Sequence, residues 1–558
     1  MSERPWLESY PPGVPADVDP GQYPSLVALM EEAFQKFSAR PFLSFLGKAY
    51  DYASVDADSR AFAAYLQGLG LAKGDRVAIM MPNVPQYPAV VAAILRAGLV
   101  VVNVNPLYTP RELEHQLRDS GARAIVIIEN FAHTLQACIA NTQVQHVVLA
   151  AMGDRLGLLK GALVNYVVRH VKKLVPAFEL PGAVRYNDAL ALGQRRSFSP
   201  PAIGPDDIAL LQYTGGTTGV AKGAVLLHRN VVANVLQSQA WKHPAMSKVP
   251  ANEQITVVCA LPLYHIFAFT VCMMLFMRLG GKVILIPNPR DLPGVLKTLS
   301  KETFHVFPAV STLFNGLAHH PQFDTVNWRN LTLSVGGGMA VQGAVAKLWL
   351  EKTGSPICEG YGLSETAPSA SCNPVTSTEF TGTIGVPIPS TWMKCIDDAG
   401  NELPPGQAGE IVIKGPQVMA GYWQRPDETA KVMTADGYFK TGDIGIMDTR
   451  GWFRIVDRKK DMILVSGFNV YPNEVEDVVG QLPGVLESAV VGMPDEKTGE
   501  AVKLVIVRKD PALTEERVRE FCRANLTAYK LPKVIEFRND LPKTPVGKIL
   551  RRELRDRK

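Results

Sequence analysis

Apolar residues recur at two different spacings in the first third of the chain. In Ser59–Gln67 and Gln86–Arg96 they return every three or four positions, which is the period of a helix with a buried face. Short apolar runs at Asp75–Met81, Val100–Val104 and Ala124–Ile128 predict strands. Because such helices and strands alternate, the pattern predicts a parallel sheet with helices covering its faces.

The pattern changes in the last third of the chain. From about Gly382 the predicted elements are short strands and turns, and Gly406–Gly415 is typical of a small β-barrel. The charge cluster Asp457–Asp461 then lies between two apolar runs and marks a boundary. Beyond it, strands and helices alternate again, and Thr514 is placed to cap one of the helices. We therefore expect an α/β protein with a second, smaller α+β domain.

Length and composition limit the classes of function. A chain of 558 residues exceeds what one hydrophobic core usually supports, so several subdomains are expected. The net charge is only +5, and aromatic and basic residues are not interleaved, so nucleic-acid binding is not expected. Seven scattered cysteines without a close CxxC pair indicate reduced thiols and no zinc site. Met1–Glu8 has no apolar signal core, so the expected location is cytoplasmic.

Two apolar stretches resemble membrane spans at first sight. Val90–Val102 is interrupted by Arg96, and Leu263–Met277 contains His265. Because a span needs roughly 20 apolar residues, both stretches are too short. Buried elements of a large core are the better interpretation.

Arg155–Phe178 is different, because it is basic and amphipathic and contains no acidic residue. Such a segment is typical of a helix that lies on an anionic membrane surface, which would give peripheral contact with the inner membrane. The alternative is a solvated helix that packs on the domain through its Val and Leu stripe.

The densest chemical signal is Tyr213–Ala224, which holds four glycines, three threonines and Lys222 between two apolar runs. Glycines let backbone N–H groups approach an anion, while the hydroxyls and the lysine add donors and charge. The stretch therefore predicts a loop that binds a polyphosphate. It is not a Walker A loop, because Gly223 follows the lysine and the next residues read as a strand. A flexible surface loop is the alternative.

Two later stretches also suit a nucleotide. Leu331–Ala340 is a strand that runs into three glycines, which let a ligand approach the backbone. In the octet that ends at Thr366, Tyr361 offers a ring face to adenine and Thr366 a hydroxyl to phosphate. Glu365 is a hard oxygen ligand suited to magnesium, which binds through few carboxylates and keeps waters and phosphates.

Three further residues stand out singly. Asp443 can accept hydrogen bonds from both ribose hydroxyls. His265 ends a strand-like run just before the apolar segment Ile266–Met277, and a buried structural histidine is the alternative. Lys548 follows a glycine in a basic segment bracketed by prolines, which composition alone would assign to a disordered tail.

These motifs, in this order, resemble those of the acyl-adenylate-forming family, which includes acyl-CoA synthetases, luciferases and peptide-synthetase adenylation domains. The resemblance covers nearly the whole chain and is most extended in Val102–His115 and Asp457–Asn473. One departure is Tyr438-Phe439-Lys440, where long-chain ligases of the family often have Trp-Leu-His. It affects no residue expected to be catalytic.

The resemblance implies a division of the chain. Residues 1–457 would form an N-terminal AMP-binding domain of two doubly wound sheet subdomains and a small β-barrel at about residues 382–457. Residues 458–460 would be a hinge with Lys460 as its pivot. Residues 461–558 would form a mobile α+β domain that carries Lys548.

The resemblance also assigns roles to residues of this chain. Lys548, Glu365 and His265 would be catalytic, and Thr217 and Glu365 would bind Mg²⁺. Ser466, Gly467 and Phe468 would help bind coenzyme A. The acyl pocket would include His265, Ile266, Phe267, Gly336, Gly337 and Gly338. The expected ATP-binding residues are Tyr213, Thr214, Gly215, Gly216, Thr217, Thr218, Gly219, Lys222, Gly337, Glu359, Gly360, Tyr361, Gly362, Thr366, Asp443, Arg458 and Lys548.

The activity implied by the resemblance is ATP-dependent conversion of long-chain fatty acids to acyl-CoA through an acyl-adenylate, feeding fatty acid degradation. Fatty acid, ATP and coenzyme A would be the partners, and a homodimer is one expected assembly. A ligase for medium-chain or aryl acids is the closest alternative, because only the pocket would differ. A non-catalytic acyl-lipid or nucleotide-binding protein is an alternative from another class. The joint presence of Lys548, Glu365, Asp443 and Arg458 argues against it.

Overall fold

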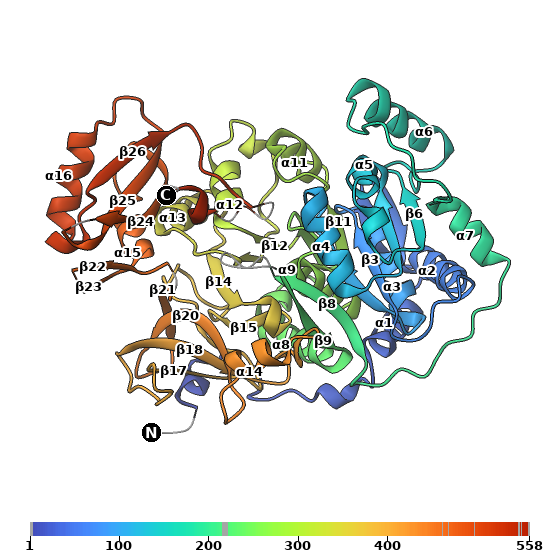
Figure 1. The fold of residues 1–558 in the computed structure, drawn as a ribbon, viewed down its shortest axis with the longest axis horizontal. Helices are drawn as coiled ribbons and strands as arrows, with labels where there is room; N and C mark the ends of the chain where they lie inside the picture. Colours follow the sequence, from blue (N-terminus) through green and yellow to red (C-terminus); the bar gives the residue numbers. More distant parts are fainter. Residues whose placement is uncertain are drawn as a thin grey trace.

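The computed structural model describes residues 4–214, 221–459, 461–466, 468–495, 497–544, 547 and 549–555. Two large sheets occupy the centre and right of Figure 1, and a four-stranded sheet lies at the lower left. The C-terminal residues form a separate sheet with its own helices at the upper left. This mixed α/β architecture, with a large N-terminal part and a smaller C-terminal part, confirms the expected fold class.

The first large sheet has eight strands in the order β19-β9-β8-β4-β3-β5-β6-β7. Its strands from β8 to β7 are parallel, whereas β9 and β19 are added antiparallel at one edge. The sheet therefore ends in the hairpin that encloses the predicted phosphate loop. Its strands are β3 (Arg76–Met80), β4 (Val100–Asn103), β5 (Ala124–Ile128), β6 (His146–Ala150), β7 (Val184–Arg185), β8 (Ile208–Thr214), β9 (Lys222–Leu227) and β19 (Gly421–Tyr422).

The second large sheet has nine strands in the order β16-β15-β14-β13-β12-β10-β11-β1-β2. It is parallel from β14 to β1 and antiparallel at both edges. Its strands are β1 (Pro41–Phe45), β2 (Lys48–Asp51), β10 (Thr256–Cys259), β11 (Lys282–Leu285), β12 (Val306–Ala309), β13 (Leu333–Gly336), β14 (Ile357–Gly362), β15 (Ser369–Cys372) and β16 (Val386–Pro387).

Helices fill the space around these sheets. Two of them, α3 (Gln86–Arg96) and α8 (His228–Met246), are almost wholly buried. The other helices of the large part are α1 (Leu26–Lys36), α2 (Tyr52–Gln67), α4 (Pro110–Ser120), α5 (Ala132–Gln136), α6 (Leu158–Tyr166), α7 (Tyr186–Gln194), α9 (Ile266–Ala268), α10 (Leu275–Arg278), α11 (Leu292–Leu299), α12 (Ser311–Ala318), α13 (Gly343–Thr353) and α14 (Pro426–Val432).

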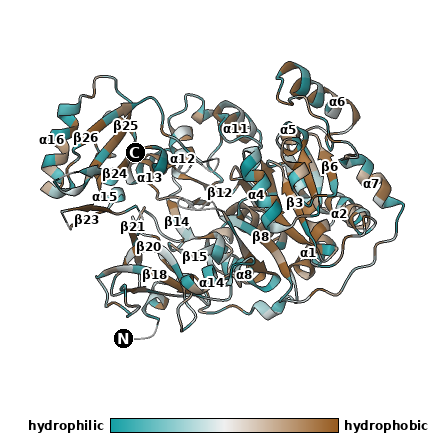
Figure 2. Cartoon of the chain, in the orientation of Figure 1, coloured by the Kyte–Doolittle hydropathy of each residue, from teal (hydrophilic) through white to brown (hydrophobic). Residues whose placement is uncertain are grey.

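One hydrophobic core joins the two large sheets, because it contains residues of both, such as Val101 of β4 and Val257 of β10. Figure 2 shows the hydrophobic residues running along β3 and β6 inside the molecule. The two apolar stretches are buried elements, as expected: α3 with β4, and α9, a π turn at Phe269–Met274 and α10. Within the described part of the chain, no helix is long and apolar enough to span a bilayer.

The expected β-barrel takes a different form. Residues 382–457 contain the four-stranded antiparallel sheet β17-β18-β20-β21, formed by Trp392–Ile396, Ala408–Lys414, Phe439–Met447 and Phe453–Arg458. A closed barrel of these four strands would need β17 to pair with β21, and no such pairing occurs between the described backbones of the two strands. The sheet instead covers its hydrophobic side with residues such as Ala370 and Ile384 from the neighbouring segment.

The C-terminal part is an α+β unit with its own hydrophobic core. It contains β22 (Ile463–Val465), β23 (Phe468–Val470), β24 (Val485–Asp495), β25 (Gly499–Arg508), β26 (Val534–Arg538), α15 (Pro472–Val479) and α16 (Glu515–Asn525). Thr514 caps α16 as predicted, since its hydroxyl accepts the N–H of Arg517 (3.4 Å). The expected boundaries at residues 457 and 461 stay a prediction.

The basic segment Arg155–Phe178 is not the single long helix that both interpretations assumed. Helix α6 covers only Leu158–Tyr166, and a π turn at Val167–Val171 follows it. The interpretation in which its Val and Leu stripe packs on the domain holds only for the valines. Val168 is buried and Val164 packs against the core, whereas Leu158, Leu159 and Leu163 are exposed. The physical reason is that Gly161 faces the body of the protein instead, at a separation from Gly153 too small for any side chain.

Candidate active site

The predicted phosphate loop lies between two paired strands. In the β8–β9 hairpin Tyr213 pairs with Gly223 and Thr214 with Lys222, so the two ends of the Gly/Thr stretch are held together. Lys222 begins a strand and not a helix, which agrees with the distinction from a Walker A loop. Gly215, Gly216, Thr217, Thr218 and Gly219 lie outside the described residues, so their expected roles stay predictions.

Lys222 is held by two residues far along the chain. Its Nζ forms an ion pair with Glu428 of α14 and lies 5.3 Å from the ring centroid of Tyr422 in β19. The hydrogen bond from Lys222 lowers the pKa of Glu428 to about 2, aided by Lys431. Lys222 therefore carries its positive charge at the mouth of the hairpin, where a polyphosphate would compete with Glu428 for it.

Tyr213 is fixed from the other side of the hairpin. Its hydroxyl donates to Oδ2 of Asp119 at the end of α4 (2.8 Å), and its ring packs on Gly223. Burial raises the pKa of Tyr213, and the hydrogen bond to Asp119 raises it further. The phenol therefore stays protonated, so Tyr213 positions the loop as a neutral donor.

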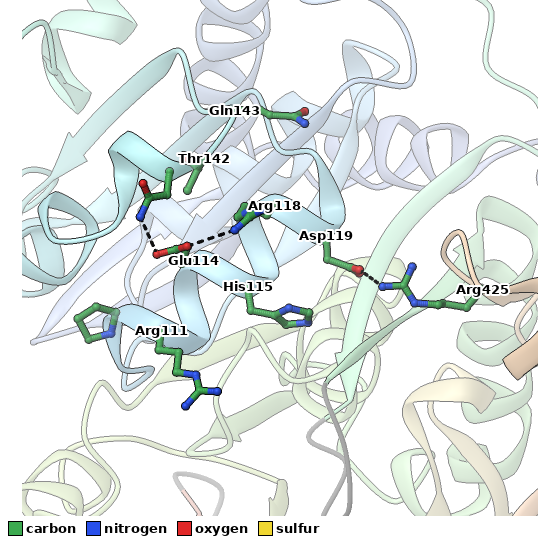
Figure 3. Close-up of a pocket in the computed structure, with 10 residues that line it drawn as sticks. Arg111, Glu114, His115, Arg118, Asp119, Thr142, Gln143 and Arg425 are labelled. Atoms are coloured by element: carbon green, nitrogen blue, oxygen red, sulfur yellow. Dashed lines mark hydrogen bonds and ion pairs between the residues drawn. The ribbon is translucent and has the colours of Figure 1, made fainter.

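A polar cavity of about 810 Å³ borders the same hairpin along α4 (Figure 3). Nε2 of His115 lies 3.1 Å from the carbonyl oxygen of Ala221, directly after the loop. Most charges around it are already paired: Arg118 with Glu114, and Arg425 with Asp119. The residues lining it are Pro110, Arg111, Glu114, His115, Arg118, Asp119, Asn141, Thr142, Gln143 and Arg425.

The three glycines that begin with the last residue of β13 have three different environments. A Cβ on Gly336 would collide with Val341 and Ile357, so Gly336 packs into the core. A Cβ on Gly337 would lie 3.0 Å from the ring of Phe267, and Gly338 has a φ of +79° that favours glycine. Gly337 and Phe267 are thus in direct contact, which agrees with their expected place along one pocket.

The carboxyl group of Glu359 supports this glycine turn from behind. Glu359 is 7% exposed, and its Oε1 accepts the N–H of Val341 (3.2 Å). Burial raises the pKa of Glu359 from 4.5 to about 8. The side chain is therefore a neutral acid at pH 7 that braces the turn, and its expected contact with ATP stays a prediction.

Tyr361 and Asp443 meet although β14 and β20 belong to different sheets. The Tyr361 hydroxyl donates to Oδ2 of Asp443 (2.6 Å), which is 3% exposed. Asp443 also pairs across the β20–β21 ladder with Arg458, whose side chain lies outside the described part. The expected adenine and ribose residues therefore come together, with Gly360 and Gly362 on either side of Tyr361 in β14.

Glu365 lies in the short helical turn after β14. Its Oε1 accepts a hydrogen bond from the Tyr422 hydroxyl (2.7 Å), which fixes the direction of the carboxylate. Thr366 corrects an expectation: its hydroxyl is fully buried and donates to the carbonyl of Pro368, so here it closes the turn and is not presented to phosphate.

One carboxylate with a fixed direction suits magnesium. No group of three or more His, Cys, Asp or Glu side chains that could hold a metal occurs in the described ranges. A site with Glu365 as its protein carboxylate fits Mg²⁺, because this ion takes one or two carboxylates and completes its shell with phosphates and waters. Thr217, the second expected ligand, lies outside those ranges.

His265 lies between the nucleotide residues and the buried α9. Its Nδ1 accepts the N–H of Phe267 (3.2 Å), so the imidazole caps α9. Ile266 is fully buried, whereas Phe267 is half-buried against Gly337. The capping contact supports the structural interpretation of His265 and does not test the catalytic one.

The C-terminal residues of the expected site lie elsewhere. Ser466 and Phe468 are at the β22–β23 turn, at the left edge of Figure 1 and away from β14. Phe468 is 58% exposed and stacks on Tyr529 at 5.0 Å. Lys460, Gly467 and Lys548 lie outside the described residues. The structure therefore does not bring Ser466 or Phe468 to the residues expected to bind ATP, and the roles of the other three stay predictions.

Three residues that hold this site were not found from the sequence. Tyr422 orients Glu365, Glu428 binds Lys222, and Asp119 fixes Tyr213. None stands in a Gly-rich or strongly charged motif, and each acts on a residue at least 57 positions away. No local signal in the chain could have identified them.

Family models and known relatives match nearly the whole chain. A model described as AMP-binding enzyme matches residues 30–423, and one described as AMP-binding enzyme C-terminal domain matches residues 474–548. The chain is 55% identical over 552 residues to a long-chain-fatty-acid–CoA ligase of Escherichia coli O6:H1, covering 99% of this chain and 98% of that protein. It is 37% identical to the protein of the same name from Bacillus subtilis, with the same coverage.

Solved structures show the same fold. ATP-bound MatB from Rhodopseudomonas palustris superposes with a TM-score of 0.81 at 29% identity, covering 95% of this chain and 98% of that one. The anthranilate CoA ligase AuaEII in complex with anthranoyl-AMP gives a TM-score of 0.84 over 96% and 98% of the two chains. At 24% identity, the second comparison supports the fold alone.

Proposed function

This chain belongs to the AMP-binding enzyme family, and on that basis we propose that it is an ATP-dependent long-chain-fatty-acid–CoA ligase. The observation that carries the proposal is its 55% identity to curated ligases of that name along 99% of its length. The family resemblance of the motifs is thereby confirmed. Fatty acid, ATP and coenzyme A follow as its substrates.

The reaction has two steps at one acyl group. A carboxylate oxygen of the fatty acid attacks the α-phosphorus of ATP, and the bond to pyrophosphate breaks. The sulfur of coenzyme A then attacks the acyl carbon, the bond to AMP breaks, and the thiol proton is lost to solvent. The first step depends mainly on positioning and charge neutralisation, which fixed donors supply.

The described residues are suited to the first step. Lys222 exchanges its ion pair with Glu428 for the β and γ phosphates of ATP. Tyr361 and Asp443, already hydrogen-bonded at 2.6 Å, take the adenine and the ribose. Glu365, oriented by Tyr422, would hold magnesium, and this ion when bound neutralises phosphate charge.

Four parts of the proposal rest on the family alone. These are the phosphate loop residues Gly215–Gly219, the ribose contact of Arg458, the pivot Lys460 and the catalytic Lys548. In the family, the C-terminal domain rotates between the two steps, which would bring the β22–β23 turn to coenzyme A. Its present distance from β14 is consistent with that motion. We place the enzyme in the cytoplasm because ATP and coenzyme A are supplied there.

A second candidate is an aryl-acid ligase. It is favoured by one observation: a feruloyl-CoA synthase of Amycolatopsis sp is 34% identical to this chain, over 92% of this chain and 94% of that protein. The candidates differ in the pocket and not in the nucleotide residues, so the acid specificity distinguishes them.

The test is pyrophosphate release with each acid from hexanoate to octadecanoate, and with ferulate. We expect KM to fall as the chain lengthens, since each buried methylene contributes about 0.8 kcal/mol. A preference for ferulate would select the second candidate, and no acid-dependent pyrophosphate would refute both. Lys548→Ala should abolish the first step yet still convert supplied acyl-adenylate to acyl-CoA, whereas Lys460→Pro should do the reverse.

A further inference from the structure

Exposed apolar side chains are concentrated on the α6 segment, defined here as residues 155–174. Of the eleven large apolar side chains that are exposed in the described ranges, six lie on it. Leu158 and Leu159 are 93% and 90% exposed, which leaves them almost entirely in water. The other four are Leu163, Tyr166, Val171 and Leu174. Such clustering marks an interaction site, whereas single exposed apolar residues do not.

The leucines point outward because Gly161 and Asn165, together with Val164 and Val168, form the face that packs on the body of the protein. A Cβ on Gly161 would lie 2.4 Å from the carbonyl oxygen of Gly153, so the two backbones are in direct contact. The Asn165 side chain then accepts the N–H of Gly153 (2.7 Å). A helix of an ordinary globular domain packs its leucines inward, and α6 does the reverse.

This orientation is held at both ends. The carbonyl oxygen of Arg155 accepts hydrogen bonds from Lys48 (2.7 Å) and Tyr50 (3.0 Å), and that of Leu174 accepts one from Asn130 (3.1 Å). Arg169 forms two hydrogen bonds with the buried carboxylate of Glu129. The segment is therefore fixed with its apolar side chains facing solvent, and it projects from the rest of the molecule at the upper right of Figure 1.

The free charges next to these side chains are positive. No Asp or Glu occurs between residues 155 and 178, and Lys172 and Lys173 are exposed. The other three Lys and Arg side chains of the segment are occupied. Arg155 pairs with Asp58, Lys160 donates to the carbonyl of Leu46, and Arg169 binds Glu129. The segment thus presents leucines together with a lysine pair.

We propose that the α6 segment docks the protein on an anionic lipid bilayer, with Leu158, Leu159 and Leu163 inserted at the acyl boundary and Lys172 and Lys173 at the headgroups. Apolar side chains on one face and lysines beside them are the features of helices that lie in the interface plane. Fourteen helical residues, 158–171, span only about 21 Å at 1.5 Å per residue, so the segment lies on the bilayer and does not cross it.

A second copy of this chain fits the segment less well. A two-fold contact through α6 would place Lys172 and Lys173 of one copy near the same residues of the other, and like charges would face each other. An anionic bilayer has the complementary charge and also accepts leucines individually, without a shaped groove.

The test is cosedimentation of the whole protein with vesicles of phosphatidylglycerol and phosphatidylcholine, without substrate. Leu158→Ser, Leu159→Ser and Leu163→Ser combined should lower the vesicle partition coefficient at least tenfold. The matched control is Leu192→Ser on α7, another exposed leucine, which should bind as the unchanged protein does. At positions so exposed, both variants should keep the thermal midpoint of the unchanged protein.

The lysines are tested separately. Lys172→Gln and Lys173→Gln should each weaken binding to anionic vesicles about fivefold. Added salt should also weaken this binding, because it screens the attraction. Neutral phosphatidylcholine vesicles should bind weakly. The proposal is overturned if the triple serine variant binds vesicles as the unchanged protein does. It is also overturned if the unchanged protein fails to bind, or if that variant instead converts a dimer to a monomer in sedimentation.

Discussion

The hydroxyl of Tyr422 donates a hydrogen bond of 2.7 Å to Oε1 of Glu365 and so joins β19 to the turn after β14. The same tyrosine ring lies under Nζ of Lys222. One side chain therefore contacts both the lysine proposed to bind phosphate and the carboxylate proposed to hold magnesium. Burial raises the pKa of Tyr422 and Glu365 raises it further, so the phenol remains a donor at every working pH.

Tyr422→Phe should raise the Mg²⁺ concentration needed for half-maximal activity by about tenfold. The reason is that loss of a group that orients a metal ligand weakens metal binding by roughly 10- to 100-fold. The phenylalanine keeps the ring under Lys222, so KM for the fatty acid should change little. The measurement is pyrophosphate release against Mg²⁺ after EDTA treatment. Tyr438→Phe, directly before β20, is the control, and an equal Mg²⁺ shift in both variants would refute this role.

Glu428→Gln should tighten ATP binding by about threefold, because Lys222 would no longer exchange one anionic partner for another. Lys222→Gln should weaken it in the same calorimetric titration. Asp427→Asn removes a like charge one position away without touching Lys222 and serves as the control. If Glu428→Gln weakens ATP binding, the glutamate supports the lysine and does not compete for it.

Glu359→Gln should change how stability depends on pH. The folded pKa of Glu359 is about 8 and the ordinary value is 4.5, so between these values the folded state holds a proton that the unfolded state has lost. The unchanged protein therefore loses stability as pH rises through this window, by roughly 1 kcal/mol per pH unit from this group. Glutamine keeps the bond from Val341 and does not titrate, so this loss disappears.

The thermal midpoints of the two proteins should thus be similar near pH 5 and should diverge in favour of Glu359→Gln towards pH 8. Glu351→Gln, on the exposed face of α13, should track the unchanged protein at every pH. A constant difference between Glu359→Gln and the unchanged protein would mean that Glu359 is ionised in the folded state.

Gly337→Ala should shift the enzyme towards shorter acids. Its Cβ would lie 3.0 Å from the ring of Phe267 and 3.2 Å from the carbonyl of Gly360, so the ring must move. Loss of space for one methylene costs about 0.8 kcal/mol, or roughly a fourfold rise in KM for octadecanoate relative to decanoate. Gly343→Ala is the control, because no atom lies within 4 Å of its Cβ. An unchanged profile would place the pocket elsewhere.

Arg551→Gln should loosen the C-terminal unit. Its guanidinium lies between Glu476 (2.8 Å), Asp461 (3.7 Å) and the fully buried Asp457 (3.9 Å), on both sides of the expected hinge. Removing one partner of a buried ion pair lowers the stability of the unit by about 3 kcal/mol. The amides of α15 should therefore exchange with deuterium roughly a hundredfold faster.

The loss of stability caused by Arg551→Gln should be smaller at low pH. Burial raises the pKa of Glu476 and Arg551 opposes this, so in the variant the folded pKa of Glu476 rises further. The folded variant then holds a proton that the unfolded state loses, and its stability falls as pH rises. The exposed neighbour Arg552→Gln should leave exchange unchanged. Equal effects of Arg551→Gln and Arg552→Gln would show that the buried network contributes nothing specific.

The sequence alone determined the elements whose periodic pattern is strong. The limits of α3 and β5 agree with prediction, since burial of a helix or strand imposes a period that a single segment displays. The β8–β9 hairpin was also predictable, because glycine, hydroxyl and lysine stand together in one short stretch between two apolar runs. These features depend on neighbours in the chain.

Only the tertiary structure decided what those elements meet. Tyr422 lies 57 positions from Glu365, and Glu428 lies 206 positions from Lys222, so no local pattern relates them. The direction of α6 is the sharpest case, because its sequence was compatible both with a packed Val and Leu stripe and with a helix facing a membrane surface. The Gly161–Gly153 contact leaves its leucines in solvent. Periodicity fixes which residues share a face of a helix, whereas packing against distant backbone decides which face is buried.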